Sequence, residues 1–183
     1  MISEKDLTRA TDALLKLAAE RPWREISLRD IAQEAGIALP DLYARADGKS
    51  ALLALLSTRF DQASLATAAT ASDDVHDRLF DAVMARVEVM EPHRAALTSI
   101  ARDMGLDAAA VAFARHFPRT ARAILEGAGV DATPPRLAAT TALWLRIAQV
   151  WRDDEGALNR TMAEIDKRLK QIRSQLGRIG AGF

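Results

Sequence analysis

The side chains best suited to catalysis are few in this chain of 183 residues, and they are scattered. There is no cysteine, which excludes a disulfide framework and thiol chemistry. The three histidines, His76, His93 and His116, lack the spacing of a metal site or of a nucleophile–base pair. Two glycines, Gly127 and Gly129, follow a predicted helix rather than a strand, so they indicate a helix end and not a phosphate-binding loop. The sequence therefore predicts a protein that is no enzyme and that uses no cofactor or metal.

A different kind of chemistry is indicated between residues 27 and 53, where two short helical segments flank a tight turn. Ser27 and Asp30 have the spacing of a capping box at the start of the first segment, 27–35. Gly36 follows, and glycine tolerates the positive φ that such a turn needs. The second segment covers 40–45 and begins with a proline, which suits a first helical turn. This is the helix-turn-helix pattern, in which the second helix enters the major groove of DNA.

The same stretch resembles the N-terminal domain of the TetR family of one-component transcription regulators, and it aligns with the pattern of that family without a gap. The departures lie at Ala38-Leu39-Pro40-Asp41, where the family usually has Ser-Lys-Gly-Thr, and at Arg45-Ala46-Asp47, where it usually has His-Phe-Pro. The positions that carry the resemblance are Ser27, Arg29, Asp30, Ile31, Ala32, Ala35, Gly36, Ile37, Leu42, Tyr43, Lys49, Ala51, Leu52 and Leu53.

The resemblance implies that this domain contacts DNA, mainly at phosphates, through a set of residues in and around the second helix. These residues are Arg29, Leu39, Pro40, Asp41, Tyr43, Arg45 and Lys49. Residues 1–60, however, contain nine basic and nine acidic residues, which is not the basic surface typical of a strong DNA binder. Two interpretations therefore stay open: a DNA-binding domain, and a scaffold that is retained for another task.

The composition favours an all-α protein, because 49% of the residues are hydrophobic, only 5% are aromatic, and β-branched runs are few. About nine helices are expected from the apolar periodicity. They cover residues 3–20, 27–35, 40–45, 47–68, 74–91, 93–103, a segment beginning at 107, 134–152 and 157–176. Ser3 and Asp6 have the spacing of a capping box at the start of the first helix, and Trp23 after it is expected to be a core anchor. Pro92 should break the chain between two helices, and Pro118 should kink or divide another. The resemblance implies a TetR-like fold, with a DNA-binding head at 1–47 and a ligand-binding and dimerisation body at 48–183, the fourth helix linking the two.

Large or adaptable apolar side chains gather on the predicted helices of the body. The resemblance implies that these helices surround an effector pocket, and the composition suits a small apolar effector, although ordinary core packing explains the same residues. The candidate pocket residues are Met84, Met90, Met104, Phe113, Phe117, Trp144 and Trp151.

The last predicted helix contains the most regular apolar pattern of the chain, a seam with alternating spacings of four and three that runs from Leu158 to Ile179. The resemblance implies that the last two helices form an antiparallel pair that builds the interface of a homodimer. A seam within one chain explains the pattern as well. The candidate interface residues are Leu143, Ile147, Leu158, Met162, Ile165 and Leu169.

The end of the chain is basic: no acidic residue follows Asp166, whereas five Lys and Arg residues do. A basic amphipathic helix can rest on an anionic membrane surface. Together with a weaker similarity to a TetR-like lipid-binding accessory family of ubiquinone biosynthesis, this gives a second hypothesis: a protein peripheral to the membrane that does not bind DNA.

The favoured hypothesis is a homodimeric transcription regulator in the cytoplasm. It binds a palindromic operator as a repressor and is released from it when a small apolar ligand binds. A cytoplasmic location is expected because the polar start of the chain does not resemble a signal peptide and no run of about 18 apolar residues occurs.

Overall fold

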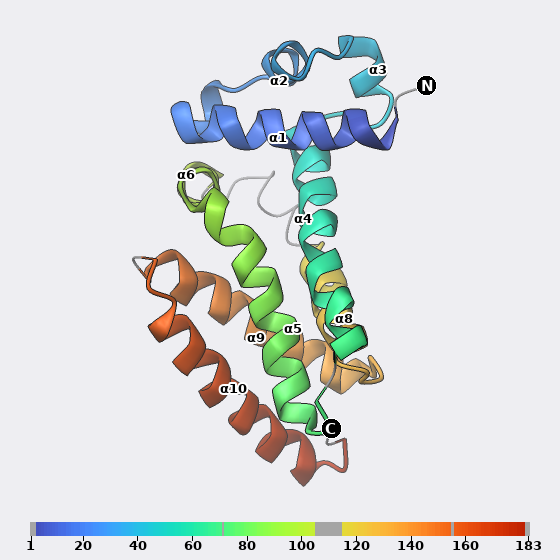
Figure 1. Ribbon diagram of the computed structural model, residues 1–183, viewed down its shortest axis with the longest axis vertical. Helices are drawn as coiled ribbons and strands as arrows, with labels where there is room; N and C mark the ends of the chain where they lie inside the picture. Colours follow the sequence, from blue (N-terminus) through green and yellow to red (C-terminus); the bar gives the residue numbers. More distant parts are fainter. Residues whose placement is uncertain (1–2, 71, 105–114, 155, 182–183) are drawn as a thin grey trace. The chain divides into compact units, whose positions relative to one another are not determined.

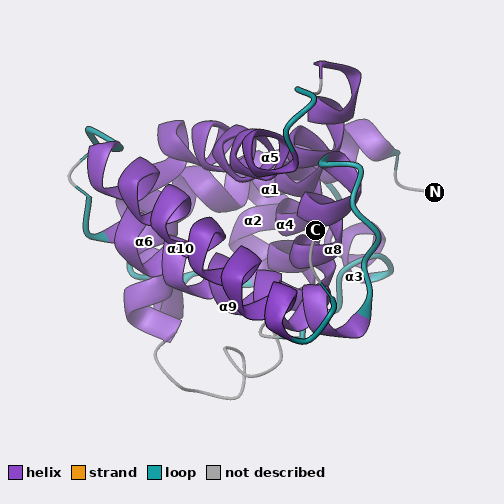
Figure 2. Cartoon of the chain, turned by 90° about the horizontal axis from the view of Figure 1, so that it is seen from below, coloured by secondary structure: helices purple, strands orange, loops and turns teal. Residues whose placement is uncertain are grey.

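The computed structural model describes residues 3–70, 72–104, 115–154 and 156–181, and the regular elements in these residues are all helical (Figure 1). Figure 2 shows the same arrangement by element type, without a strand in the described part of the chain. The predicted all-α fold class is thus confirmed. The α-helices are α1 (Glu4–Glu20), α2 (Leu28–Ala35), α3 (Leu39–Tyr43), α4 (Lys49–Ala66), α5 (Val75–Met90), α6 (Arg94–Met104), α8 (Phe117–Gly127), α9 (Pro134–Arg152) and α10 (Asn159–Arg178).

These helices form two compact units. The first unit contains Met1–Thr58 and His93–Arg115, and the second contains Arg59–Pro92 and His116–Phe183. Helix α4 begins in the first unit and ends in the second. The division predicted from the sequence, 1–47 and 48–183, concerns binding functions and stays a prediction. None of the helices in the described residues is long and apolar enough to cross a membrane.

The first unit is built from α1, α2, α3, the start of α4 and α6. Two predicted capping boxes are confirmed: Ser3 with Asp6 at α1, and Ser27 with Asp30 at α2. In each box the serine side chain accepts a hydrogen bond from the backbone N–H of the aspartate, and the carboxylate accepts one from the serine N–H, so two otherwise unsatisfied donors are bonded. The core of this unit includes Leu14, Ile31 and Leu42, all without exposed surface.

Helix α6 belongs to this first unit because it packs on α1 and on the short 3-10 turn Trp23–Glu25. The predicted break at Pro92 is confirmed, since a 3-10 turn at Glu91–His93 separates α5 from α6. Trp23 is 4% exposed, as expected for a core anchor, and its backbone N–H donates to the Asp103 carboxylate of α6 at 2.7 Å.

The second unit is built from the end of α4 with α5, α8, α9 and α10. Helices α9 and α10 lie side by side after a short turn, and α5 packs against α10 (Figure 1). The apolar seam of α10 is buried in these contacts within the chain. Its buried residues include Ile165, Leu169, Ile172 and Leu176. The end of α8 approaches the end of α4 so closely that a Cβ atom at Gly127 would overlap the backbone carbonyl of Ser64.

Pro118 stands in the first turn of α8, which begins at Phe117. A missing N–H is harmless there, since the first turn has no intrahelical acceptor for it. The expected kink or division by Pro118 stays a prediction, because residues 105–114 before it lie outside the described residues. The first part of the helix predicted to begin at residue 107 lies outside the described residues, and α8 forms its later part.

Candidate functional site

The helix-turn-helix of the first unit is formed as the sequence predicts. Gly36 ends α2 with φ of 64°, the left-handed conformation that favours glycine, and the Ile37 N–H donates back to the carbonyl of Ala32 at 2.9 Å. Leu42 has no exposed surface and anchors α3, while Ile31 does the same for α2. The turn and the two anchors therefore hold α3 with one face turned away from the core of its unit.

The outward surface of α3 is short, and half of its exposed side chains are apolar. Tyr43 is 59% exposed, and Leu39 is half-buried. The exposed residues of the segment 38–45 are Ala38, Pro40, Asp41, Tyr43, Ala44 and Arg45. Every predicted DNA-contacting residue of this segment is thus wholly or partly accessible. Whether these residues contact DNA stays a prediction.

Charged groups on this surface are few and partly paired. Arg45 is 3.8 Å from the Glu4 carboxylate, with both side chains well exposed. Such an exposed pair is weak, so a phosphate can replace the glutamate as the partner of the guanidinium. Arg29 is exposed on α2. The Asp41 side chain is exposed, and its carboxylate forms no hydrogen bond or ion pair with the other residues that the structure describes.

Lys49 occupies a position that the sequence does not reveal. Its ammonium donates to the Trp23 carbonyl at 2.5 Å and lies 4.4 Å from the centroid of the indole ring. The Trp23 N–H donates to Asp103 of α6, and the Trp23 carbonyl accepts from Lys49 of α4. The backbone of Trp23 therefore connects α4 to α6. We call the three residues Asp103, Trp23 and Lys49 the tryptophan brace. The Lys49 ammonium thus contacts Trp23 within the protein. A contact between Lys49 and DNA stays a prediction.

Most candidate effector residues lie in the interior of the second unit. Met84, Met90, Trp144 and Trp151 are all at most 8% exposed. The indole N–H of Trp151 donates to the Glu91 carboxylate at 2.7 Å. Adaptable methionine and aromatic tryptophan side chains of this kind are found in small-molecule sites and also in ordinary helical cores.

The remaining candidates are placed differently. Phe117 is half-buried at the start of α8. Met104 is buried in the other unit, at the end of α6, and Phe113 lies outside the described residues. The role of all these residues in binding an effector stays a prediction.

The second unit also contains a buried ion pair that the sequence reasoning missed. Arg86 of α5 is 3% exposed and Asp61 of α4 is 4% exposed, and the guanidinium donates to the carboxylate. The guanidinium also lies 4.7 Å from the Trp144 ring and 5.8 Å from the Phe60 ring, so aromatic faces cover the cation. Burial lowers the pKa of Arg86 to about 10, which leaves it charged at neutral pH, and burial raises the pKa of Asp61. One signal was readable: Arg86 stands seven residues after Leu79, on the apolar stripe of its helix.

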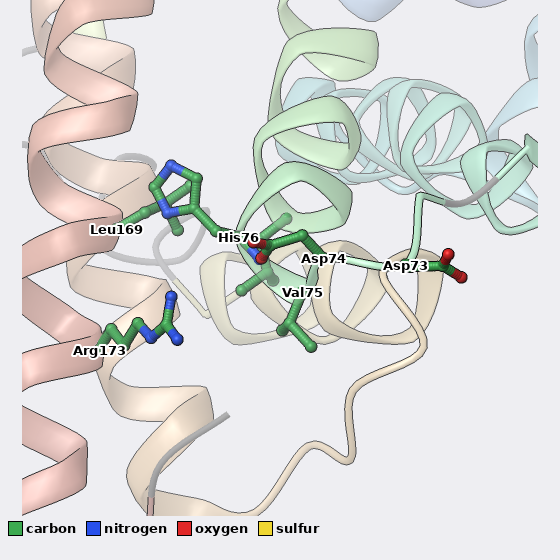
Figure 3. A pocket seen from close by; sticks show the side chains of 7 residues that line it. Asp73, Asp74, Val75, His76, Leu169 and Arg173 are labelled. Carbon is green, nitrogen blue, oxygen red and sulfur yellow. The ribbon is translucent and has the colours of Figure 1, made fainter.

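A pocket of about 280 Å³ lies between the start of α5 and the middle of α10. Figure 3 shows Leu169 and Arg173 on the α10 side, across from His76 and Val75. The His76 Nε2 atom is 3.0 Å from the Asp166 carboxylate, and hydrogen bonds from Lys170 and His76 lower the pKa of Asp166. None of the candidate effector residues lines this pocket, which joins acidic and basic side chains.

The candidate dimer residues are mostly used within the chain. Leu143, Ile147, Ile165 and Leu169 are at most 3% exposed, so they have almost no surface left for a partner. Leu158 is half-buried, in the left-handed conformation that precedes α10, and Met162 is 42% exposed. The α9 face turned away from this core has another apolar residue, Leu145, at 45% exposed.

The basic end of the chain does not present the apolar face that a membrane helix needs. The apolar residues of α10 from Ile165 to Leu176 are buried, and among the large hydrophobic residues of 165–181 only Ile179 is strongly exposed. Two of the cations are already paired: Arg168 with the Glu164 carboxylate and Lys170 with the Asp166 carboxylate, each at 2.7 Å. Among the described residues, no group of three or more His, Asp or Glu side chains could hold a metal ion.

Comparison with known proteins agrees with this geometry. Residues 10–56 match the sequence family described as bacterial regulatory proteins, tetR family. No curated protein matches the chain. A TetR transcriptional regulator from Rhodococcus sp. RHA1 has a similar structure, with a TM-score of 0.71, 16% identity, and coverage of 91% of this chain and 94% of that one.

Two further solved structures give the same result. The fatty acid degradation regulator FadR from Bacillus halodurans has a TM-score of 0.57 at 14% identity, covering 94% of this chain and 96% of its own. A tetR-family transcriptional regulator from Streptomyces coelicolor has a TM-score of 0.53 at 19% identity, covering 99% and 84%. The likenesses establish the fold, and they do not favour the lipid-binding accessory hypothesis.

Proposed function

We propose that this chain, which carries the N-terminal domain of the TetR family and has the fold of TetR-family transcriptional regulators, binds operator DNA as a ligand-responsive homodimer. The observation that carries the proposal is the intact helix-turn-helix: buried Leu42 and the left-handed turn at Gly36 support an α3 whose other face is exposed. Two copies of α3 in one dimer would enter successive major grooves, about one helical turn apart.

Arg29, Tyr43 and Arg45 are the proposed phosphate contacts, because they are exposed side chains that can donate hydrogen bonds. With so few cations, the salt dependence of binding should be shallow compared with that of strongly basic regulators. Sequence-specific contacts must then supply a large part of the affinity.

The test is a fluorescence anisotropy titration of labelled DNA from the region upstream of the gene, against a scrambled duplex, at low and at moderate salt. We expect tighter binding to the upstream DNA and a loss of about tenfold for Arg45→Ala, as one good contact contributes about 1–3 kcal/mol. Arg122→Ala is the matched control, because Arg122 is an exposed arginine on α8, and this variant should bind like the wild type. Equal affinity for both duplexes would overturn the proposal.

Dimerisation is proposed to use the exposed face of α9, because the seam of α10 is already buried in its own chain. Ala138, Ala142 and Leu145 share this face at helical spacing, and small residues let two helices approach closely. Leu145→Arg should convert a dimer to a monomer in sedimentation experiments, while Ile179→Arg, at another exposed apolar residue, should not. A dimer that survives Leu145→Arg contradicts this interface.

The proposed effector is small and apolar, and binds near the Met84, Trp144 and Trp151 side chains. Binding to the folded state raises the melting temperature by mass action. We expect naphthalene or dodecanol to raise Tm and to weaken the binding of upstream DNA, as for a repressor that is released by its ligand. If neither compound changes Tm or DNA affinity, the effector is not of this chemical class.

A further inference from the structure

The surface of α3 has a hydrogen-bonding character that indicates which bases it can read. Within residues 38–45 the exposed side chains are three apolar ones, one carboxylate, one phenol and one guanidinium. Guanine presents two acceptors in the major groove, N7 and O6, and is normally read by a bidentate cation. The one cation of this surface, Arg45, follows the end of α3 and lies beside Glu4, so the body of the helix has no such group.

The apolar side chains suit a different base feature. Ala38, Pro40 and Ala44 are exposed without a polar atom in their side chains, and they occupy the beginning and the end of α3. In the major groove, the apolar group is the 5-methyl of thymine, and short apolar side chains contact it closely.

Asp41 is the exposed charged residue in the middle of α3. It has no ion-pair partner among the described residues, and its charge is repelled by phosphates. A carboxylate becomes favourable in the groove only where a base donates a hydrogen bond to it. Cytosine presents the N4 amino group as its donor, whereas adenine places the N7 acceptor next to its amino group, and that acceptor repels a carboxylate.

We propose that α3 reads its operator through thymine methyl groups and one cytosine amino group, with Ala38, Pro40 and Ala44 as methyl contacts and Asp41 as the acceptor. This inference rests on the proposed function and specifies the DNA that the same site takes. It also assigns a role to the segment 38–41, which lacks the polar residues usual at this place. Asp41 adds discrimination by repulsion, because guanine and thymine present acceptors that oppose its carboxylate.

The first experiment selects duplexes from a randomised library with the full-length chain. The expected half-site contains thymines at the positions under the ends of α3 and a cytosine at the central position. Replacing each selected thymine by uracil, which removes only the methyl group, should then weaken binding about fourfold, the size expected for burial of one apolar carbon.

The second experiment exchanges the acceptor. Asp41→Asn should move the preference at the central position from cytosine to adenine, because an amide pairs with both N6 and N7 of adenine. Asp47→Asn is the matched control: it removes the same charge from an exposed site nearby, so it should strengthen binding to all duplexes without changing base preference.

The outcomes separate the two proposals. A chain that selects no sequence overturns the proposed function itself. A chain that selects a sequence, but binds uracil duplexes as tightly as thymine duplexes and keeps its base preference in Asp41→Asn, remains a regulator and overturns only this reading of α3.

Discussion

The buried pair of Arg86 and Asp61 gives the sharpest prediction for stability. We consider Asp61→Leu, which removes the carboxylate and leaves the guanidinium in place. Because Arg86 is 3% exposed, its charge cannot be rehydrated without opening the second unit. Removing one partner of a buried pair costs about 3–5 kcal/mol, because an uncompensated charge is left inside. The Trp144 and Phe60 rings reduce this cost but cannot accept a hydrogen bond as a carboxylate does.

The double variant Asp61→Leu/Arg86→Met separates the charge effect from the loss of packing. With both charges absent, the site becomes an apolar core of similar volume, and such replacements are often neutral or stabilising. We therefore expect the double variant to recover most of the stability that the single variant loses. With the single variant Arg86→Met added, the three variants complete a double-mutant cycle: the unfolding free-energy change of the double variant, minus those of the two single variants, is the coupling energy of the pair.

The assay is guanidinium chloride unfolding, followed by circular dichroism and by tryptophan fluorescence, with the slope m checked for each variant. Glu126→Leu is the control, because Glu126 and Arg122 form a pair 4.0 Å apart with both side chains 55% exposed, and its loss should cost less than about 1 kcal/mol. A cost below about 1 kcal/mol for Asp61→Leu, or a double variant no better than the single one, would refute the reasoning.

Three further predictions follow from other contacts. Gly127→Ala should destabilise the second unit by about 1–3 kcal/mol, because the added Cβ overlaps the α4 backbone. The control Gly177→Ala, in α10 with open space around it, should be neutral or stabilising in the same unfolding assay. Equal effects of the two variants would contradict this prediction. Asp103→Ala should speed amide hydrogen exchange at Trp23, while Asp103→Asn, which keeps an oxygen acceptor, should change it less; no change in either variant argues against the tryptophan brace. Acidification below about pH 5 should destabilise the first unit. Hydrogen bonds from Ser3 lower the pKa of Asp6 from its ordinary 3.8 to about 2 in the folded chain. The stability that the ionised carboxylate contributes above its unfolded pKa is therefore lost as the pH falls through its folded pKa. Asp6→Asn should reduce the acid dependence of the CD-monitored midpoint, and an unchanged dependence would count against the capping box.

Much of the fold follows from interactions that span one helical turn. The capping boxes at Ser3 and Ser27 are serine and aspartate three residues apart, and each was placed correctly from the sequence alone. The turn at Gly36 is equally local, because its positive φ is a property of one residue. Pro118 is a less decisive signal, because proline is compatible both with the first turn of a helix and with a break in one; the structure places it in the first turn of α8.

The candidate site was predicted in part. The sequence identified the helix-turn-helix and the exposed face of α3, since these depend on spacing within about twenty residues. It also identified the apolar seam of α10, although it could not say whether the seam meets another copy or its own chain. Helices α9 and α5 cover that seam, because burial against the nearest available apolar surface needs no partner.

What the sequence alone determined about this protein is therefore most of its helices, two of their N-terminal caps and the place of the helix-turn-helix. The tertiary structure decided which distant groups meet: Lys49 with Trp23, Trp23 with Asp103, and Arg86 with Asp61. These partners lie 26, 80 and 25 residues apart in the chain, respectively. Local backbone preferences act over three or four residues, whereas pairings at such separations are chosen by how the helices pack and by the cost of burying a charge or an N–H without a partner.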